Sequence, residues 1–244
     1  MKEILRLENI TKRFADGSRD LTVLNGLSLT VDKGDFIAIT GESGAGKTSL
    51  LNIIGTLIDA DGDYYIKGER LGSNSKVNSG VICQLRNKEI GFVYQDHRLL
   101  PQFTVMENIL LPTLATKKSS TEEEQRRALD LLDFMCISAL KDSPVTQLSG
   151  GEQTRVAICR ALINQPSILL ADEPTGQLDA ANTQTIATLF QQVNAKLHTT
   201  IIMATHSAEM AKAAGKVFHL KGGKLHEAPE FTSGGNIIKV CSNN

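Results

Sequence analysis

The chain has 244 residues, of which 41% are hydrophobic, so it can bury the core of one large α/β domain or of two small ones. Its 26 basic and 27 acidic residues leave a formal net charge of −1. This balance excludes the overall basic surplus that is typical of nucleic-acid-binding domains, and it gives the chain as a whole no attraction to an anionic membrane surface.

The most apolar stretches are too short and too interrupted to span a bilayer, as residues 108–115 (NILLPTLA) illustrate. We therefore expect a partner to hold the chain at a membrane if it works there. The cysteines show neither a C-x-x-C pair nor zinc-ligand spacing, so free thiols are expected at Cys83, Cys136, Cys159 and Cys241.

The first third of the chain is dominated by strand patterns. Residues 3–35 alternate apolar and polar side chains between turn signals, which predicts antiparallel strands. DFIAIT, residues 35–40, predicts a buried strand that runs into a glycine-rich loop, and TSLLNIIGTL then has helical spacing. Residues 62–76 return to strand and turn character, VICQLRNKE favours a short helix, and IGFVYQ is a further strand.

From residue 96 to about residue 147 the pattern becomes helical. Thr104 with Glu107, and Thr121 with Glu124, have the spacing of capping boxes at two helix starts. Beyond QLSGGEQTR, residues 147–155, helices alternate with the strands SILLA and TIIMAT before a short helix and a terminal hairpin around KGGK. Strands that alternate with helices of this length predict a parallel sheet.

Residues 41–48, GESGAGKT, match the pattern G-x-x-x-x-G-K-[ST] in full. The glycines let backbone N–H groups converge on phosphate oxygens, Lys47 supplies a positive charge for the β- and γ-phosphates, and Thr48 offers a hydroxyl to Mg²⁺. A simple glycine-rich turn is the alternative, but the strand before it and the helix after it favour a phosphate loop. The expected nucleotide-binding residues of this loop are Gly41, Glu42, Ser43, Gly44, Ala45, Gly46, Lys47, Thr48 and Ser49.

An acidic pair follows the predicted strand SILLA. Asp172 is expected to hold Mg²⁺ directly or through water, and Glu173 is placed to polarise an attacking water molecule as general base. An exposed acidic turn that Pro174 ends is the alternative. The complete phosphate loop upstream makes nucleotide hydrolysis the better interpretation.

Six motifs in this order resemble those of the ATP-binding cassette (ABC) ATPases, and together they cover nearly the whole chain. They are GESGAGKT, YQD (94–96), QLSGGEQTR, ILLADE, LDA (178–180) and ATHS (204–207). The resemblance implies an α/β fold: a P-loop NTPase core with a mostly parallel sheet, an N-terminal antiparallel β subdomain and an inserted helical subdomain. A single nucleotide-binding domain, 1–244, would combine a RecA-like core and the β subdomain (1–95 and 149–244) with a helical subdomain (96–148).

The resemblance also implies roles for further residues. Gln95 matches the loop glutamine that contacts Mg²⁺ or water, and His206 matches the histidine that contacts the γ-phosphate. Asp179 matches the loop that couples the two sites of a dimer. Phe14 matches the aromatic residue that stacks on adenine, where the family commonly has Tyr; a core position is the alternative for it.

The LSGGE segment of this family caps the nucleotide that the other subunit's phosphate loop holds. Ser149, Gly150 and Gly151 would therefore point at the γ-phosphate bound by a neighbouring copy. One chain carries one phosphate loop and one LSGGE segment. A head-to-tail dimer of the chain is thus implied, with ATP and Mg²⁺ as its cofactors.

The stretch that starts at Ile90, IGFVYQDHRLLPQFTVMENILLP, resembles one branch of the family, which includes lipoprotein-release, macrolide-export and cell-division ATPases. Thr154 is among the departures from that branch. The resemblance implies a cytoplasmic ATPase subunit, peripheral on the inner face of the cell membrane, that drives separately encoded permease subunits and binds no nucleic acid.

The alternative to this function is a cell-division-type regulatory ATPase that signals through a membrane partner. A soluble cassette ATPase of translation or DNA repair ranks low, and Glu173 with His206 disfavours a module that binds nucleotide without hydrolysis. The transported or released substrate stays open.

Overall fold

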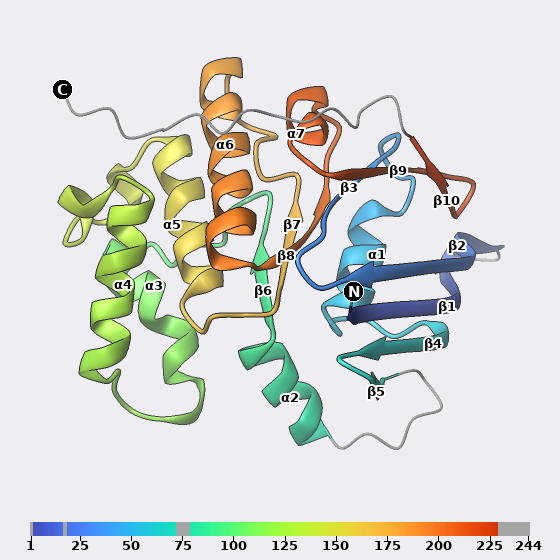
Figure 1. Cartoon of the computed structure of the whole chain (residues 1–244), viewed down its shortest axis with the longest axis horizontal. Helices are drawn as coiled ribbons and strands as arrows, with labels where there is room; N and C mark the ends of the chain where they lie inside the picture. Colours follow the sequence, from blue (N-terminus) through green and yellow to red (C-terminus); the bar gives the residue numbers. More distant parts are fainter. Residues whose placement is uncertain (1, 17–18, 72–78, 229–244) are drawn as a thin grey trace.

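The computed structural model describes residues 2–16, 19–71 and 79–228, which form two β-sheets and the helices around them (Figure 1). The smaller sheet is antiparallel and has the strand order β2-β1-β4-β5. Its strands are β1 (Glu3–Asp16), β2 (Arg19–Asp32), β4 (Asp61–Ile66) and β5 (Glu69–Arg70). The antiparallel strands predicted over 3–35 are confirmed.

The larger sheet has the strand order β10-β9-β3-β8-β7-β6. All neighbours in it are parallel except the terminal hairpin pair β9 and β10, so the predicted mostly parallel sheet is confirmed. Its strands are β3 (Phe36–Thr40), β6 (Ile90–Val93), β7 (Ile168–Asp172), β8 (Thr200–Ala204), β9 (Lys216–Lys221) and β10 (Lys224–Glu227).

The central strands of this sheet are buried on both faces, which explains their continuous apolar runs. Successive side chains of a strand point to opposite faces and so enter different cores. In β7, Leu169 and Ala171 pack into one core, whereas Ile168 and Leu170 pack into the other. The same alternation occurs in β3 and β8.

The two cores define the layers of the molecule. On one face of the parallel sheet, α1 (Lys47–Ile54) lies between the two sheets and shares their core (Figure 1). The other face is covered by α5 (Gly150–Leu162), α6 (Ala180–Leu197) and the short α7 (Ala208–Lys212). The helix expected around VICQLRNKE is α2 (Ser79–Lys88), which lies beside β6.

The middle of the chain is helical, as predicted. It contains α3 (Val105–Leu110), η1 (Leu111–Thr116), α4 (Glu122–Phe134), η2 (Ser138–Leu140) and η3 (Val145–Gln147). Both capping boxes are present: each threonine hydroxyl accepts a hydrogen bond from the backbone N–H three residues on, and each glutamate carboxylate accepts one in return.

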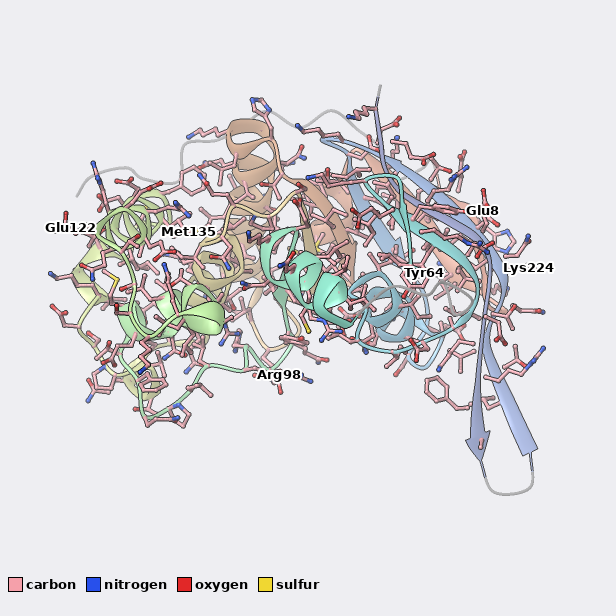
Figure 2. All side chains as sticks on the ribbon, turned by 90° about the horizontal axis from the view of Figure 1, so that it is seen from below. Glu8, Tyr64, Arg98, Glu122, Met135 and Lys224 are labelled. Carbon is pink, nitrogen blue, oxygen red and sulfur yellow. The ribbon has the colours of Figure 1, made fainter. Side chains whose placement is uncertain are left out.

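Figure 2 shows this helical block, with Glu122 and Met135, at the opposite end of the molecule from Glu8 and Lys224 of the β-strands. Its buried residues nevertheless form one continuous core with α5, α6 and the parallel sheet. The division of the chain into a helical subdomain 96–148 and a core stays a prediction.

The cysteines agree with the sequence expectation in part. Cys83 is exposed and Cys159 is buried, and both thiols are free. Cys136 is disulfide-bonded, so the expected free thiol is wrong there. Cys241 and the polar loop at 72–76 lie outside the described residues. None of the described helices combines the length and the apolar character that crossing a bilayer requires.

Strand β6 and helix α5 approach each other closely at Gly91. A Cβ atom at this position would lie 2.3 Å from the carbonyl oxygen of Ala161. Because that oxygen belongs to the backbone of a buried helix, it cannot move without shifting α5 against the sheet. Gly91 therefore sets the distance between the sheet and α5.

We expect Gly91→Ala to lower the free energy of unfolding by about 2–3 kcal/mol, because overpacking a core forces the backbone to shift. Gly215→Ala is the matched control, since the nearest atom to its new Cβ is 3.8 Å away. Urea unfolding followed by circular dichroism measures both variants. Equal stability of the two would show that α5 yields without strain.

Candidate nucleotide-binding site

The glycine-rich loop joins β3 to α1, as the sequence predicts. Gly46 is the N-cap of α1 and has φ 103°, in the region that favours glycine. A Cβ atom there would lie 2.6 Å from Val23 Cγ1. No side chain caps this helix, so its first backbone N–H groups face the loop. A helix N-terminus of this kind attracts an anion such as phosphate.

The Lys47 side chain folds back over this loop. Its Nζ donates hydrogen bonds to the carbonyl oxygens of Gly41 and Glu42, at 2.9 and 3.1 Å. The side chain is only 9% exposed and lies 3.6 Å from Glu173 Oε1, measured from Nζ. The ammonium group is thus fixed at the loop, where a bound phosphate would meet it.

Thr48 and Asp172 form a pair that fits Mg²⁺. The Thr48 hydroxyl donates to Asp172 Oδ1 at 3.2 Å, and Asp172 ends β7 as a buried residue. Burial raises the pKa of Asp172 above its ordinary value, whereas the hydrogen bond from Thr48 lowers it. The described residues contain no group of three or more His, Cys, Asp or Glu side chains that could hold a metal. Mg²⁺ commonly needs only one or two carboxylates besides substrate phosphates and water, so the pair is sufficient.

Glu173 lies between a lysine and a histidine. Its Oε2 accepts a hydrogen bond from the backbone N–H of His206 at 3.0 Å and lies 2.8 Å from His206 Nδ1. Its own N–H donates to the carbonyl of Ala204 at 2.9 Å, across from the end of β8. The residue has φ 45°, an uncommon conformation for a side chain of this size. These contacts hold the carboxylate in one orientation beside the phosphate loop.

Gln95 follows β6 and is exposed. A Cβ atom at Gly176 would lie 3.2 Å from Gln95 Nε2, and the N–H of Gly176 donates to the carbonyl of Glu173. The glutamine side chain therefore lies against the turn that follows Glu173. The carboxyl ends of β3, β6, β7 and β8 thus bring the loop, Gln95, Asp172, Glu173 and His206 to one edge of the sheet, as is usual for ligand sites of this fold class.

Ser149, Gly150 and Gly151 lie at the start of α5. Ser149 and Glu152 form a capping box, with the Ser149 N–H donating to Glu152 Oε2 at 2.8 Å. A Cβ atom at Gly151 would lie 3.1 Å from Asn182 Oδ1 of α6. In the described part of the chain, no hydrogen bond joins these three residues to the loop at 41–48. Hydrogen bonds within one chain therefore do not join the start of α5 to the glycine-rich loop.

Asp179 is the N-cap of α6, and its Oδ1 accepts a hydrogen bond from the N–H of Asn182 at 2.8 Å. The Asn182 side-chain amide also donates to Asp179 Oδ2 at 2.9 Å. Asn182 thereby touches both Asp179 and the start of α5. Sequence reasoning did not select Asn182; the only signal for it was its position three residues after a capping aspartate.

Phe14 is in β1 and is 41% exposed, so the alternative of a core residue is wrong. The Lys12 ammonium lies 5.1 Å from the centre of its ring. An exposed aromatic ring is free to stack on a nucleotide base, but its stacking on adenine stays a prediction.

We expect Lys47→Ala to weaken ATP binding by at least a hundredfold, since it removes the buried charge that faces the loop. Titration with a fluorescent ATP analogue measures the affinity, and Lys212→Ala, an exposed lysine of α7, is the control. An affinity that is unchanged in Lys47→Ala would contradict the assignment of residues 41–48 as the phosphate loop.

The comparisons with known proteins agree with this geometry. The ABC transporter family model matches residues 24–176. The lipoprotein-releasing system ATP-binding protein LolD of Saccharophagus degradans is 38% identical over 225 residues, which are 92% of this chain and 97% of that protein. The macrolide export ATP-binding/permease protein MacB of Rhodopirellula baltica is 39% identical over 226 residues, 92% of this chain and 33% of MacB.

Among solved structures, the dimeric ATP-binding cassette MJ0796 in a post-hydrolysis state, bound to ADP and Pi, superposes with a TM-score of 0.82. It is 34% identical in sequence, and the match covers 92% of this chain and 98% of that one. The chain therefore belongs to the ABC transporter family and is a nucleotide-binding ATPase of that family.

Proposed function

We propose that two copies of this chain form a head-to-tail dimer that binds and hydrolyses Mg-ATP and thereby drives a separate integral membrane subunit. The observation that carries the proposal is the position of Glu173. Its carboxylate is fixed by His206 and Lys47 and lies beside the Thr48–Asp172 pair. A carboxylate held next to a phosphate loop is placed to act on water, not merely to bind nucleotide.

Each group of the site has a defined task in this proposal. Lys47 and the N–H groups at the start of α1 bind the β- and γ-phosphates. Thr48 and Asp172 would hold Mg²⁺, which neutralises charge on the phosphates. Glu173 orients the attacking water and accepts its proton, and His206 keeps the carboxylate in place and reaches towards the γ-phosphate. Gln95 borders the turn after Glu173 and would contact the metal or its water.

The second copy completes the site. Ser149 with the N–H groups of Gly150 and Gly151 forms a second anion-accepting helix start that has no phosphate loop of its own chain within hydrogen-bond reach. A head-to-tail arrangement of two chains places each such segment over the nucleotide of the other, with Asp179 beside it. The similar cassette MJ0796 is dimeric, which supports the pairing of two copies.

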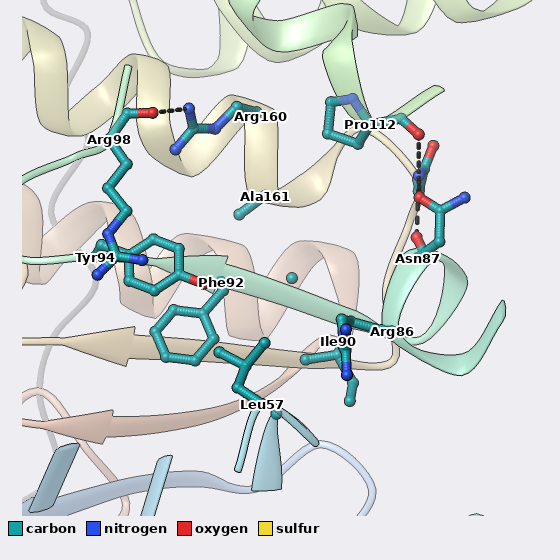
Figure 3. A pocket seen from close by; sticks show the side chains of 13 residues that line it. Leu57, Arg86, Asn87, Ile90, Phe92, Tyr94, Arg98, Pro112, Arg160 and Ala161 are labelled. Atoms are coloured by element: carbon teal, nitrogen blue, oxygen red, sulfur yellow. Dashed lines mark hydrogen bonds between the residues drawn. The ribbon is translucent and has the colours of Figure 1, made fainter. Parts of the chain in front are cut away.

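A groove next to Gln95 suits the membrane subunit. It has a volume of about 370 Å³ and is lined by residues of α2, β6, η1 and α5 and of the neighbouring turns (Figure 3). Phe92 and Tyr94 stack in it with their ring centres 4.2 Å apart, and the Arg98 guanidinium lies 4.0 Å from the centre of the Tyr94 ring. A short helix of the membrane subunit would lie here and hold the ATPase at the cytoplasmic face. The similar LolD proteins are named as ATP-binding components of lipoprotein-releasing systems, which favours a complex of that kind.

We expect Glu173→Gln to bind Mg-ATP and to stay dimeric, because the amide keeps the shape of the side chain but accepts no proton from water. Size-exclusion chromatography with light scattering, at saturating Mg-ATP, measures the dimer. Hydrolysis should fall at least a hundredfold.

The control is the double variant Glu173→Gln/Ser149→Arg, whose bulky cation would block the start of α5. It should bind ATP as a monomer with unchanged affinity but fail to dimerise. If this variant loses ATP binding as an isolated chain, the start of α5 serves its own phosphate loop and the head-to-tail dimer is wrong.

Leu57 lines the groove and is 39% exposed, so Leu57→Asp places a charge where the membrane subunit would bury an apolar contact. We expect at least a tenfold loss of the membrane subunit captured from detergent-solubilised membranes of the organism, with ATP binding by the free chain unchanged. Quantitative mass spectrometry measures the captured subunit.

Leu129→Asp is the matched control, because Leu129 is 40% exposed on α4 and does not line the groove. It should capture the membrane subunit as the unaltered chain does. Equal loss in both variants, or in neither, would place the docking surface elsewhere.

A further inference from the structure

The turn that carries Gln95 has an unusual backbone. The N–H of His97 donates to the carbonyl of Tyr94 at 3.0 Å, and both His97 and Arg98 have positive φ, 56° and 48°. Two successive non-glycine residues in the left-handed region are costly and persist only where the surroundings hold them. Contacts outside the turn must therefore determine its conformation.

Helix α5 supplies these contacts at two levels. Near its C-terminal end, the Arg160 guanidinium donates to the carbonyl oxygen of Arg98 at 2.6 Å (Figure 3). It also donates to the carbonyl oxygen of His97 at 2.6 Å. Near its N-terminal end, the His97 ring Nε2 lies 2.8 Å from the Thr154 hydroxyl oxygen, and His97 is buried. The turn after β6 is thus joined to both halves of the helix that begins at Gly150.

The direction of the hydrogen bonds around Thr154 follows from the number of hydrogens that its side chain can donate. The Thr154 hydroxyl has one hydrogen and donates it to the carbonyl of Gly150 at 3.0 Å. With that hydrogen in use, the Thr154 oxygen accepts a hydrogen bond from the tautomer of His97 that carries its hydrogen on Nε2. One chain of hydrogen bonds thus runs from His97 through Thr154 to Gly150.

We propose that His97 and Thr154 are positioning residues that transmit the conformation of the Gln95 turn in one nucleotide site to the start of α5, which caps the nucleotide of the other copy. This coupling rests on the proposed head-to-tail dimer. Gln95 is two residues from His97, and Thr154 is one helical turn from Gly150. A shift of the Gln95 turn on ATP binding would therefore move the Gly150 and Gly151 N–H groups.

The alternative is a buried polar pair that only stabilises the fold. A structural pair changes stability alone, whereas a positioning pair changes turnover and dimer closure with little effect on ATP binding by one chain. The described residues form several hydrogen bonds between this turn and α5. Of these, the Thr154–His97 bond lies nearest to Gly150. It is therefore the bond whose loss separates the two roles.

The test starts with Thr154→Val, which keeps the shape of the side chain and removes its hydroxyl. We expect kcat to fall about tenfold, which is the effect of one hydrogen bond lost from a buried partner. In the Glu173→Gln background, the dimer dissociation constant at saturating Mg-ATP should rise about tenfold. The affinity of the single chain for ATP should stay within twofold. Thr154→Ser retains the hydroxyl, so its kcat should stay close to that of the unaltered chain.

Thr188→Val is the matched control. Thr188 is also buried in a helix, α6, and its hydroxyl likewise donates to the carbonyl four residues before it, at 3.0 Å. It should lose similar stability in urea unfolding but keep its kcat. Equal kcat for Thr154→Val and Thr188→Val overturns the coupling.

Variants of His97 test the other end of the bond and keep the test valid if Thr154→Val folds poorly. His97→Gln places an amide donor near the position of Nε2 and should retain kcat, whereas His97→Asn is too short and should lower it about tenfold. Combining His97→Asn with Thr154→Val should lower kcat no further than either change alone, because both break one chain of bonds. Effects that multiply overturn the proposal. If Glu173→Gln alone fails to dimerise, both the proposed dimer and this coupling are wrong. If Glu173→Gln dimerises but Thr154→Val has the same kcat as Thr188→Val, the dimer stands and only the coupling is wrong.

Discussion

The Glu173 carboxylate is the group on which the site depends, because it neutralises a lysine that the fold has buried. Lys47 is 9% exposed and Glu173 is 12% exposed, and a charge at such depth needs a partner. The carbonyls of Gly41 and Glu42 and the Glu173 carboxylate provide that partner. A phosphate in the loop would take over the role of counter-charge. Glu173 would then stay bonded to His206, with its other oxygen available to water.

This arrangement requires that strands far apart in the sequence end at the same level. The parallel register pairs Asp172 of β7 with Ala204 of β8, so that Glu173 and His206 leave their strands side by side. The register is itself held by two cores on opposite faces of the sheet, since a slip by one residue would exchange Leu169 and Leu170 between them. The packing of apolar side chains thereby sets the positions of the polar groups.

Much of this could be predicted from the sequence, because its signals are local. The phosphate loop, the Asp172–Glu173 pair and the capping boxes each lie within a few residues, and their spacing alone specifies their geometry. Contacts between distant residues gave no such signal. His97 and Thr154 are 57 residues apart, and the sequence marks Thr154 only as a departure from a family pattern. Asn182 against Gly151, and the disulfide state of Cys136, likewise depend on tertiary placement.

The groove and the candidate nucleotide site meet at one turn, and adjacent residues of that turn belong to one or the other. The Tyr94 ring stacks on Phe92 within the groove, whereas the Gln95 side chain lies against the turn after Glu173. In the proposed complex, a membrane helix in the groove and a nucleotide in the site would act on the same backbone, which His97 and Arg160 connect to α5. Coupling between two ligands is reciprocal. If ATP favours the conformation of this turn that the membrane helix binds, the membrane helix must raise the affinity for ATP by the same factor. The short turn after β6 would then link the proposed membrane subunit to closure of the proposed dimer.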